Sequence, residues 1–141
     1  MLLNLDPLLT GHLLAVLDEM GHSDGIAVVD AHFPAAALSA RPFIDLPGIG
    51  APRVLKAICS VLPLDDEPAL DLMASPGPDL TSVQSDLVAT AGLDRSQVRE
   101  LGRQEFYDEA HAAYVVVRTG EVRPFGNAIV RKGLCPTPAE A

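Results

Sequence analysis

The amino-acid sequence predicts an α/β fold with three layers, in which a largely parallel central sheet is flanked by helices. Short apolar segments alternate along most of the chain with segments of helical periodicity, and this alternation is typical of βαβ units. Residues 26–29 (Ile-Ala-Val-Val) form a continuous apolar run, which is typical of a strand covered on both faces. Residues 114–117 (Tyr-Val-Val-Val) are strongly β-branched and predict a second core strand.

Several segments have the periodicity of helices longer than one turn. Thr10 is a suitable N-cap for a helix that continues to about Met20, and Gly21 fits the left-handed position that ends such a helix. Pro52 suits the first turn of a second helix, which should end near Pro63. Two further helices are predicted over residues 82–91 and 103–113, and a single turn is predicted over residues 35–38.

The remaining strands are predicted between these helices, over residues 43–44, 69–74, 98–101 and 127–130. The last two strands of the chain are close enough in sequence to be antiparallel. No internal repeat, low-complexity segment or long linker interrupts the pattern, and 141 residues lie within the ~100–200 residues usual for one domain. We therefore expect a single domain over residues 1–141.

Composition restricts the classes of partner. The net charge is −9, from 19 acidic and 10 basic residues, and scattered basic residues argue against binding to nucleic acid. No apolar run reaches the ~18 residues of a membrane helix, and the first residues lack the basic start of a signal peptide, so we expect a cytoplasmic protein with no membrane partner. A hydrophobic fraction of 48% with only 4% aromatic residues suggests buried subunit contacts, and hence a homo-oligomer.

The candidate site residues begin with His22, which follows the helix-ending glycine and is expected in a loop. An unperturbed imidazole titrates near pH ~6.5, so such a histidine can transfer protons. Asp30 ends the first buried strand, where open α/β sheets bind ligands, and its carboxylate could bond sugar hydroxyls or orient a histidine. Arg103 and Asn127 offer further hydrogen-bonding groups. The alternatives are solvated side chains, and for Asp30 a cap on the turn at residues 33–34.

Other kinds of chemistry have weaker support in the sequence. His22, Asp30 and His32 could together bind a metal ion, because Asp-x-His places two side chains on one side of an extended segment, but no further ligand has a recognisable spacing. Neither of the two cysteines has a metal or catalytic signature. Gly48-Ile-Gly50 lacks the Gly-Lys-Ser/Thr ending of a phosphate loop. We therefore expect no metal and no cofactor.

Taken together, these segments resemble the L-fucose mutarotase and D-ribose pyranase family over nearly the whole chain. The motifs that carry the resemblance agree in order and in spacing. They are Met20-Gly-His22, Asp24, Asp30-Ala-His-Phe-Pro34, Phe106-Tyr107, Thr119-Gly-Glu121, Gly126-Asn127 and Lys132-Gly133. The motif that begins at Asp30 is similar to the fucose branch, because ribose pyranases tend to have Asp-Ala-Gly-Leu-Pro there. Arg103, and Gly rather than Ala before Asn127, point the same way.

The resemblance implies a ribose-pyranase-like fold and a metal-free, cofactor-free isomerase that interconverts the α and β anomers of L-fucose or a related monosaccharide. His22 would then be the proton donor. The sugar would be contacted by Asp30, Arg103 and the segment Phe125-Gly126-Asn127. Members of the family form ring-shaped assemblies, often decamers, in which neighbouring subunits complete the sites, so the resemblance also implies a homo-oligomer.

One position departs from the family pattern. Family members usually have Tyr before the Gly-Asn pair, whereas this chain has Phe125, which has no hydroxyl group to donate. Tyr107 and Tyr114 are other possible sources of a hydroxyl. The departure leaves a second hypothesis open, a sugar-binding accessory protein without turnover, and the metal-binding protein described above is a third.

Overall fold

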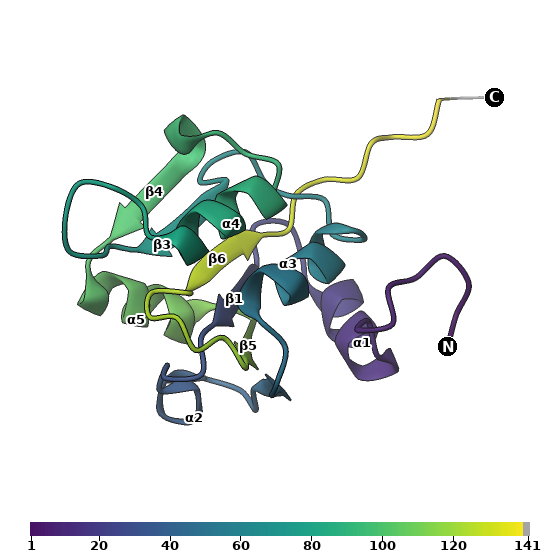
Figure 1. Cartoon of the computed structure of the whole chain (residues 1–141). Helices are drawn as coiled ribbons and strands as arrows, with labels where there is room; N and C mark the ends of the chain where they lie inside the picture. Colours follow the sequence, from purple (N-terminus) through teal and green to yellow (C-terminus); the bar gives the residue numbers. More distant parts are fainter. Residues whose placement is uncertain (140–141) are drawn as a thin grey trace.

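The computed structural model describes residues 1–139, which form a six-stranded sheet between two layers of helices (Figure 1). The helices are α1 (Gly11–Glu19), α2 (Ala35–Leu38), α3 (Ala51–Cys59), α4 (Ser82–Thr90) and α5 (Arg103–Ala112), with a 3-10 turn η1 (Arg95–Gln97). The strands are β1 (Gly25–Val29), β2 (Ile44–Leu46), β3 (Leu70–Met73), β4 (Val98–Leu101), β5 (Val115–Thr119) and β6 (Ala128–Arg131). Within residues 1–139, no helix is both long enough and apolar enough to cross a membrane.

The sheet has the strand order β2-β5-β1-β6-β3-β4. Strand β6 runs antiparallel to both of its neighbours, β1 and β3, and the other paired strands are parallel. The predicted α/β fold with a largely parallel sheet is therefore confirmed. The predicted antiparallel relation of the last two strands is correct in direction, but β1 lies between them, so they do not form a hairpin.

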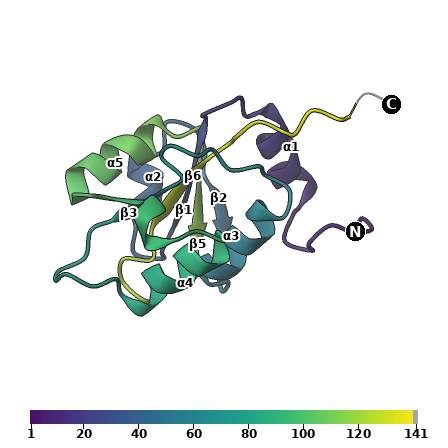
Figure 2. The ribbon, with the colours of Figure 1, turned by 90° about the horizontal axis from the view of Figure 1, so that it is seen from above.

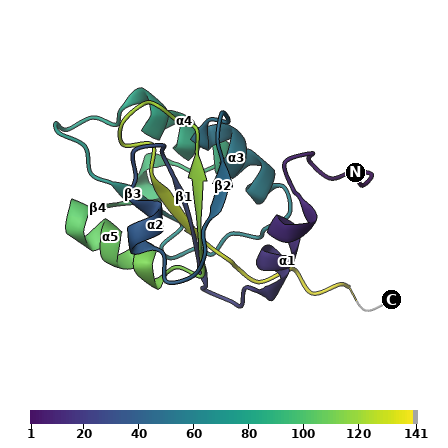
Figure 3. The ribbon, with the colours of Figure 1, turned by 90° about the horizontal axis from the view of Figure 1, so that it is seen from below.

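Helices cover both faces of the sheet. Figures 2 and 3 show α3 and α4 on one face and α2 and α5 on the other. Because side chains alternate along a strand, Ile26 and Val28 of β1 pack into the cluster on the α3 and α4 side, together with residues of α1. Ala27 and Val29 pack into the cluster on the α2 and α5 side. The continuous apolar run in β1 is thus explained by burial on two faces, as predicted.

The first helix begins as predicted and ends differently. The Thr10 hydroxyl accepts a hydrogen bond from the Leu13 amide, which caps α1. Gly21 does not adopt the left-handed conformation that was expected to end the helix; the left-handed residue is Ser23, with φ 68°. The carbonyl groups at this helix end are instead bonded by the ammonium group of Lys132, which donates to the carbonyls of residues 17, 18 and 20 at 2.8, 3.2 and 2.6 Å. Lys132, which is distant in sequence, therefore caps the end of α1 in place of the predicted left-handed glycine.

A buried ion network lies between β3 and α5. The carboxylate of Asp71, which is fully buried, accepts two hydrogen bonds from Arg99, at 2.7 and 2.8 Å, and one from Arg131, at 2.8 Å. Arg131 also donates to Glu109. The network satisfies a charge that the apolar core would otherwise leave without a partner.

Replacing Asp71 by Ala is expected to lower the free energy of unfolding by about 3–5 kcal/mol, because it removes the buried carboxylate that two arginines bond and leaves the largely buried Arg131 with only the more exposed Glu109 as an acidic partner. Urea denaturation measures the change. The matched control is Asp45→Ala, which removes an exposed carboxylate that is also bonded by an arginine, Arg118, and should cost within about 1 kcal/mol. Equal losses of unfolding free energy in the two variants would contradict a large stabilising contribution of the Asp71 network.

Candidate active site

A cavity of about 310 Å³ opens at the edge of the sheet where the parallel strands end. It is lined by Asp30, His32, Phe33, Pro34, Met73, Arg103, Tyr107, Pro124, Phe125 and Asn127. Strand β6 is antiparallel to its neighbours, so its N-terminal end lies at the same edge of the sheet as the C-terminal ends of β1, β3 and β4. The topology therefore brings together side chains up to 97 positions apart in the sequence. The volume is in the range of small-ligand pockets, roughly 300–1,000 Å³.

Asp30 and Asn127 form a reciprocal pair in this cavity. The Asp30 amide donates to Oδ1 of Asn127 at 2.9 Å, and Nδ2 of Asn127 donates to Oδ2 of Asp30 at 3.0 Å. The other carboxylate oxygen of Asp30 accepts the His32 amide at 3.0 Å, so the predicted cap on this turn is present as well. Burial raises the pKa of Asp30, and the bonds from the His32 and Gly126 amides and from Asn127 counteract it. A carboxylate held this firmly can orient sugar hydroxyls.

The loop between β5 and β6, residues 120–127, forms one wall of the cavity. Phe125 has φ 65°, a left-handed conformation that bulky residues rarely adopt. Gly126 is required next to it, because a Cβ at this position would lie 2.8 Å from Cγ of Glu121. Such backbone outliers persist where the surrounding structure determines them, and they concentrate at functional sites.

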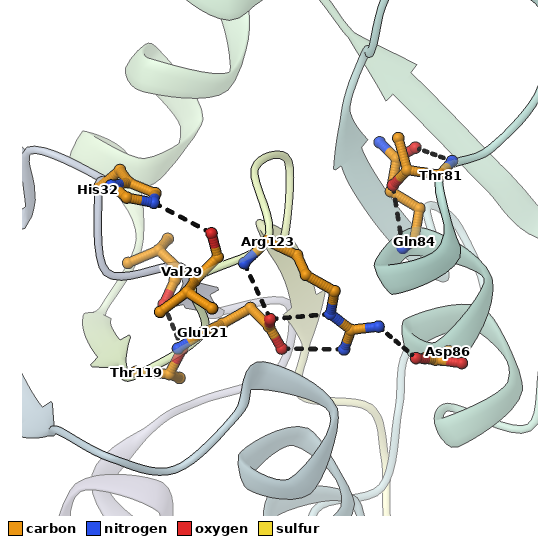
Figure 4. A network of polar contacts seen from close by, with 9 residues as sticks. Val29, His32, Thr81, Gln84, Asp86, Thr119, Glu121 and Arg123 are labelled. Atoms are coloured by element: carbon orange, nitrogen blue, oxygen red, sulfur yellow. Dashed lines mark hydrogen bonds and ion pairs between the residues drawn. The ribbon is translucent and has the colours of Figure 1, made fainter.

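Glu121 provides that surrounding structure, as Figure 4 shows. Its buried carboxylate accepts hydrogen bonds from the guanidinium group and the amide of Arg123, at 2.9 to 3.1 Å. The Arg123 guanidinium group also donates a hydrogen bond to the carboxylate of Asp86, at 2.9 Å. The Arg123 guanidinium holds the pKa of Glu121 below its usual range. On the other side of the loop, Nε2 of His32 lies 3.1 Å from the Val122 carbonyl (Figure 4). The wall is thus fastened to α4 and to the segment after β1.

Two residues of α5 complete the cavity. Arg103 is the first residue of the helix, with an exposed side chain, and Tyr107 lies one turn later. The ring of Tyr107 packs edge-on against Phe33, with 5.5 Å between the ring centres. The other tyrosine lies elsewhere, since the Tyr114 hydroxyl donates to Glu19 at 3.0 Å, next to the start of β5. Tyr107 is therefore the tyrosine that lines the cavity.

His22 does not lie in this cavity. It precedes β1, whereas Asp30 follows it, and the five residues of the strand span about 16 Å. The imidazole is half-exposed, and its Nε2 lies 3.5 Å from Oδ2 of Asp65. His22 and Asp30 of one chain therefore do not share a crevice, because an extended strand places its two flanking residues at opposite edges of the sheet. The same separation excludes a metal ion held jointly by His22, Asp30 and His32 of one chain.

No three His, Cys, Asp or Glu side chains of residues 1–139 cluster where they could hold a metal ion. The structure places His32, considered above only as a metal ligand, and Tyr107, considered above as a source of a hydroxyl, in the lining of the cavity. It places Glu121 in the loop that supports the cavity. Glu121 belongs to the Thr119-Gly-Glu121 motif, which the sequence analysis singled out without predicting that Glu121 supports the loop at the cavity. Nothing local in the sequence marks Asp65 as the neighbour of His22.

The fold and the cavity define an α/β protein with a cavity of small-ligand size at the carboxyl edge of its sheet. The chain belongs to the RbsD / FucU transport protein family, whose profile matches residues 3–135. The resemblance seen in the motifs is thereby confirmed.

Individual relatives agree with this assignment. The L-fucose mutarotase of Actinobacillus pleuropneumoniae serotype 5b (strain L20) is 36% identical over 96% of this chain and 99% of its own length. The fucose mutarotase of Danio rerio is 35% identical over 91% and 90%. The structure of the Streptococcus pneumoniae fucose mutarotase in complex with L-fucose matches with a TM-score of 0.86 at 29% identity, over 96% of this chain and 100% of the other. Bacillus subtilis RbsD, solved with D-ribose, shares the fold, with a TM-score of 0.74, 20% identity and coverage of 96% and 99%.

Proposed function

We propose that this protein is a sugar mutarotase that interconverts the α and β anomers of L-fucose or a related monosaccharide. The observation that carries the proposal is the convergence of Asp30, Arg103, Phe125 and Asn127 on one small cavity, in a chain that matches L-fucose mutarotases along nearly its full length. These four residues and Gly126, whose amide bonds Asp30, are proposed to bind the sugar. The cavity needs no cofactor for this task.

The reaction makes modest chemical demands. A base takes the proton of the anomeric hydroxyl while an acid protonates the ring oxygen, so that the C1–O5 bond breaks and an aldehyde forms. Rotation about C1–C2 exposes the other face of the aldehyde, and reclosure returns both protons. Acid and base groups each contribute about 10²–10⁴-fold, which is sufficient for a reaction that already occurs in water. His22 is proposed as the acid.

Because His22 lies at the far edge of its own sheet, we infer that it serves the cavity of a neighbouring subunit. The protein would then be a homo-oligomer, and a ring such as a decamer satisfies the requirement that every cavity meets a histidine of the next copy. Val122, which is 72% exposed, lies in the loop that borders the cavity and supplies apolar surface for such a contact. We place this assembly in the cytoplasm.

Saturation-exchange NMR on α- and β-L-fucose tests the proposal. Protein-dependent magnetisation transfer between the two anomeric signals is expected, with a panel of related sugars as comparison. The second candidate function is a sugar-binding protein without turnover, which the absence of a hydroxyl on Phe125 favours. Measurable binding of fucose without exchange would support that candidate and contradict the mutarotase.

Tyr107 is expected to supply the hydroxyl that Phe125 lacks. Tyr107→Phe should lower the exchange rate by about 2- to 12-fold, which corresponds to one neutral hydrogen bond of ~0.5–1.5 kcal/mol. Adding Phe125→Tyr to that variant should restore the rate, because both side chains line the same cavity. Tyr114→Phe, outside the cavity, is the matched control and should leave the rate unchanged. A rate that does not respond to Tyr107→Phe would remove this hydroxyl from the site.

A further inference from the structure

Anomer exchange requires a base as well as an acid, and the proposed acid, His22, lies outside the cavity of its own chain. Four side chains that line the cavity carry groups that take part in proton transfer. They are Asp30, His32, Arg103 and Tyr107. A guanidinium group has no lone pair to offer, and a neutral phenol is a far weaker base than an imidazole. The base of the cavity is therefore sought between Asp30 and His32.

Asp30 is already engaged by the protein. Its Oδ1 accepts the His32 amide at 3.0 Å, and its Oδ2 accepts Nδ2 of Asn127 at 3.0 Å. Hydrogen bonds that a carboxylate accepts stabilise its charged form and make it a weaker base. Burial raises the pKa of Asp30, but an ordinary carboxylate titrates about 2–3 pH units below an ordinary imidazole. Asp30 is thus better suited to hold a hydroxyl than to take its proton.

His32 has one ring nitrogen bonded and the other available. Nε2 lies 3.1 Å from the carbonyl oxygen of Val122 (Figure 4). Because a carbonyl only accepts hydrogen bonds, Nε2 carries the proton of the neutral ring and Nδ1 carries the lone pair. Within residues 1–139, no hydrogen bond occupies Nδ1. The lining of the cavity therefore includes a neutral imidazole with a lone pair that can accept a proton.

The surroundings of His32 also suit the positive charge that the ring acquires with a second proton. The Val122 carbonyl keeps its donor, since Nε2 stays protonated throughout. The Asp30 carboxylate lies two residues away and accepts the His32 amide, so it places a negative charge beside the ring. Burial raises the pKa of Asp30, and the charge of a protonated His32 acts against that rise, as expected for two groups that attract each other.

We propose that His32 is the base of the anomer exchange, and that its Nδ1 takes the proton of the anomeric hydroxyl. Imidazole is the side chain that ordinarily changes charge between pH 5 and 8, where a general base is most effective. As Nδ1 takes this proton, His22 of a neighbouring subunit donates one to the ring oxygen, the C1–O5 bond breaks and the aldehyde forms. On reclosure, the C5 hydroxyl returns a proton to His22, and the new anomeric oxygen takes back the proton from His32. The proposal rests on the proposed function.

His32→Gln is the first test, because it separates the base from the contact with the loop. A glutamine amide can donate to the Val122 carbonyl as Nε2 does, but it has no basic nitrogen. The expected result is a loss of about 10²–10⁴-fold in kcat with little change in KM, measured by exchange NMR over a range of L-fucose concentrations. If His32 only fastened the loop, His32→Gln would keep a nearly normal kcat, and that result would overturn the proposal.

His111→Asn is the matched control. Nδ1 of His111 lies 2.8 Å from the Leu38 carbonyl, so this imidazole also faces a carbonyl group, but it is exposed and does not line the cavity. An asparagine amide can keep that contact while the ring is lost. Both kinetic constants should remain unchanged in this variant.

Imidazole added to His32→Ala gives a readout that a structural role would not move. The substitution removes the base and leaves space beside the cavity, so free imidazole should partly restore the exchange rate. The rate that imidazole produces without protein is subtracted, and the wild-type protein with imidazole is the control. A stimulation of His32→Ala no larger than that of the wild-type protein would contradict a base at this position.

Ring ¹⁵N chemical shifts separate the role of His32 from the function on which it rests. In protein labelled at its four histidines, the His32 signals are assigned with His32→Gln. Without sugar, Nδ1 should have the shift of an unprotonated nitrogen, and L-fucose should move it when a hydroxyl donates to the lone pair. A shift that responds to fucose in a protein without exchange would contradict the mutarotase alone. Bound fucose that leaves the Nδ1 shift unchanged would overturn the proposal for His32.

Discussion

His22→Ala is expected to abolish protein-dependent anomer exchange, with a loss of about 10²–10⁴-fold. The fold should remain intact, because the imidazole is half-exposed and, within residues 1–139, its one close polar contact is with Asp65. Saturation-exchange NMR measures the rate, and the urea midpoint compared with that of the wild-type protein measures stability. His12→Ala is the matched control, since it removes an exposed histidine of α1 that the proposed site does not contain.

A complementation experiment then decides whether His22 acts across a subunit boundary. His22→Ala and Asp30→Asn should each be inactive alone, because one lacks the acid and the other an intact sugar pocket. After co-refolding of equal amounts, about a quarter of the sites should combine an intact pocket from one variant with His22 of the other, if each pocket meets one neighbour. Recovery of activity to about that fraction is expected. Mixed assemblies that stay inactive would show that His22 does not serve a neighbouring cavity.

Asn127→Leu should have the second large effect, on both binding and stability. Asn127 is 4% exposed and makes two hydrogen bonds to Asp30, one of them to its carboxylate. Leucine leaves the Asp30 amide and one carboxylate oxygen without these partners. A hydrogen bond to a charged group contributes about 1.5–3 kcal/mol, so a loss of at least that free energy of unfolding is expected.

Sugar binding should be lost in the same variant, since Asp30 would no longer be held in the cavity. Urea denaturation and titration with L-fucose measure the two effects. The control is Gln104→Leu, an exposed amide on α5 bonded to Asp108, for which a change within about 0.5 kcal/mol is expected. Normal fucose affinity in Asn127→Leu would contradict the role given to the Asp30–Asn127 pair.

The helices and strands were largely predictable, because each has a local cause. Thr81 caps α4, whose helical periodicity was visible in the sequence, through a capping box with Gln84, and β4 covers the predicted residues 98–101. Predictions failed where the structure depends on residues that are distant in sequence. Lys132 caps α1 in place of Gly21, and nothing within a few residues of that helix end could have shown it. The proximity of β5 and β6 in sequence likewise did not reveal that β1 lies between them.

The sequence alone determined the family, the fold class and four of the residues that line the cavity, Asp30, Arg103, Phe125 and Asn127, because these depend on residue type, periodicity and motif spacing. Only the tertiary structure decided which of those residues meet. The antiparallel course of β6 brings residues 125–127 to Asp30, whereas the extended course of β1 takes His22 to the opposite edge, beside Asp65. Strand order and direction follow from long-range packing of the whole sheet, and no local pattern contains that information.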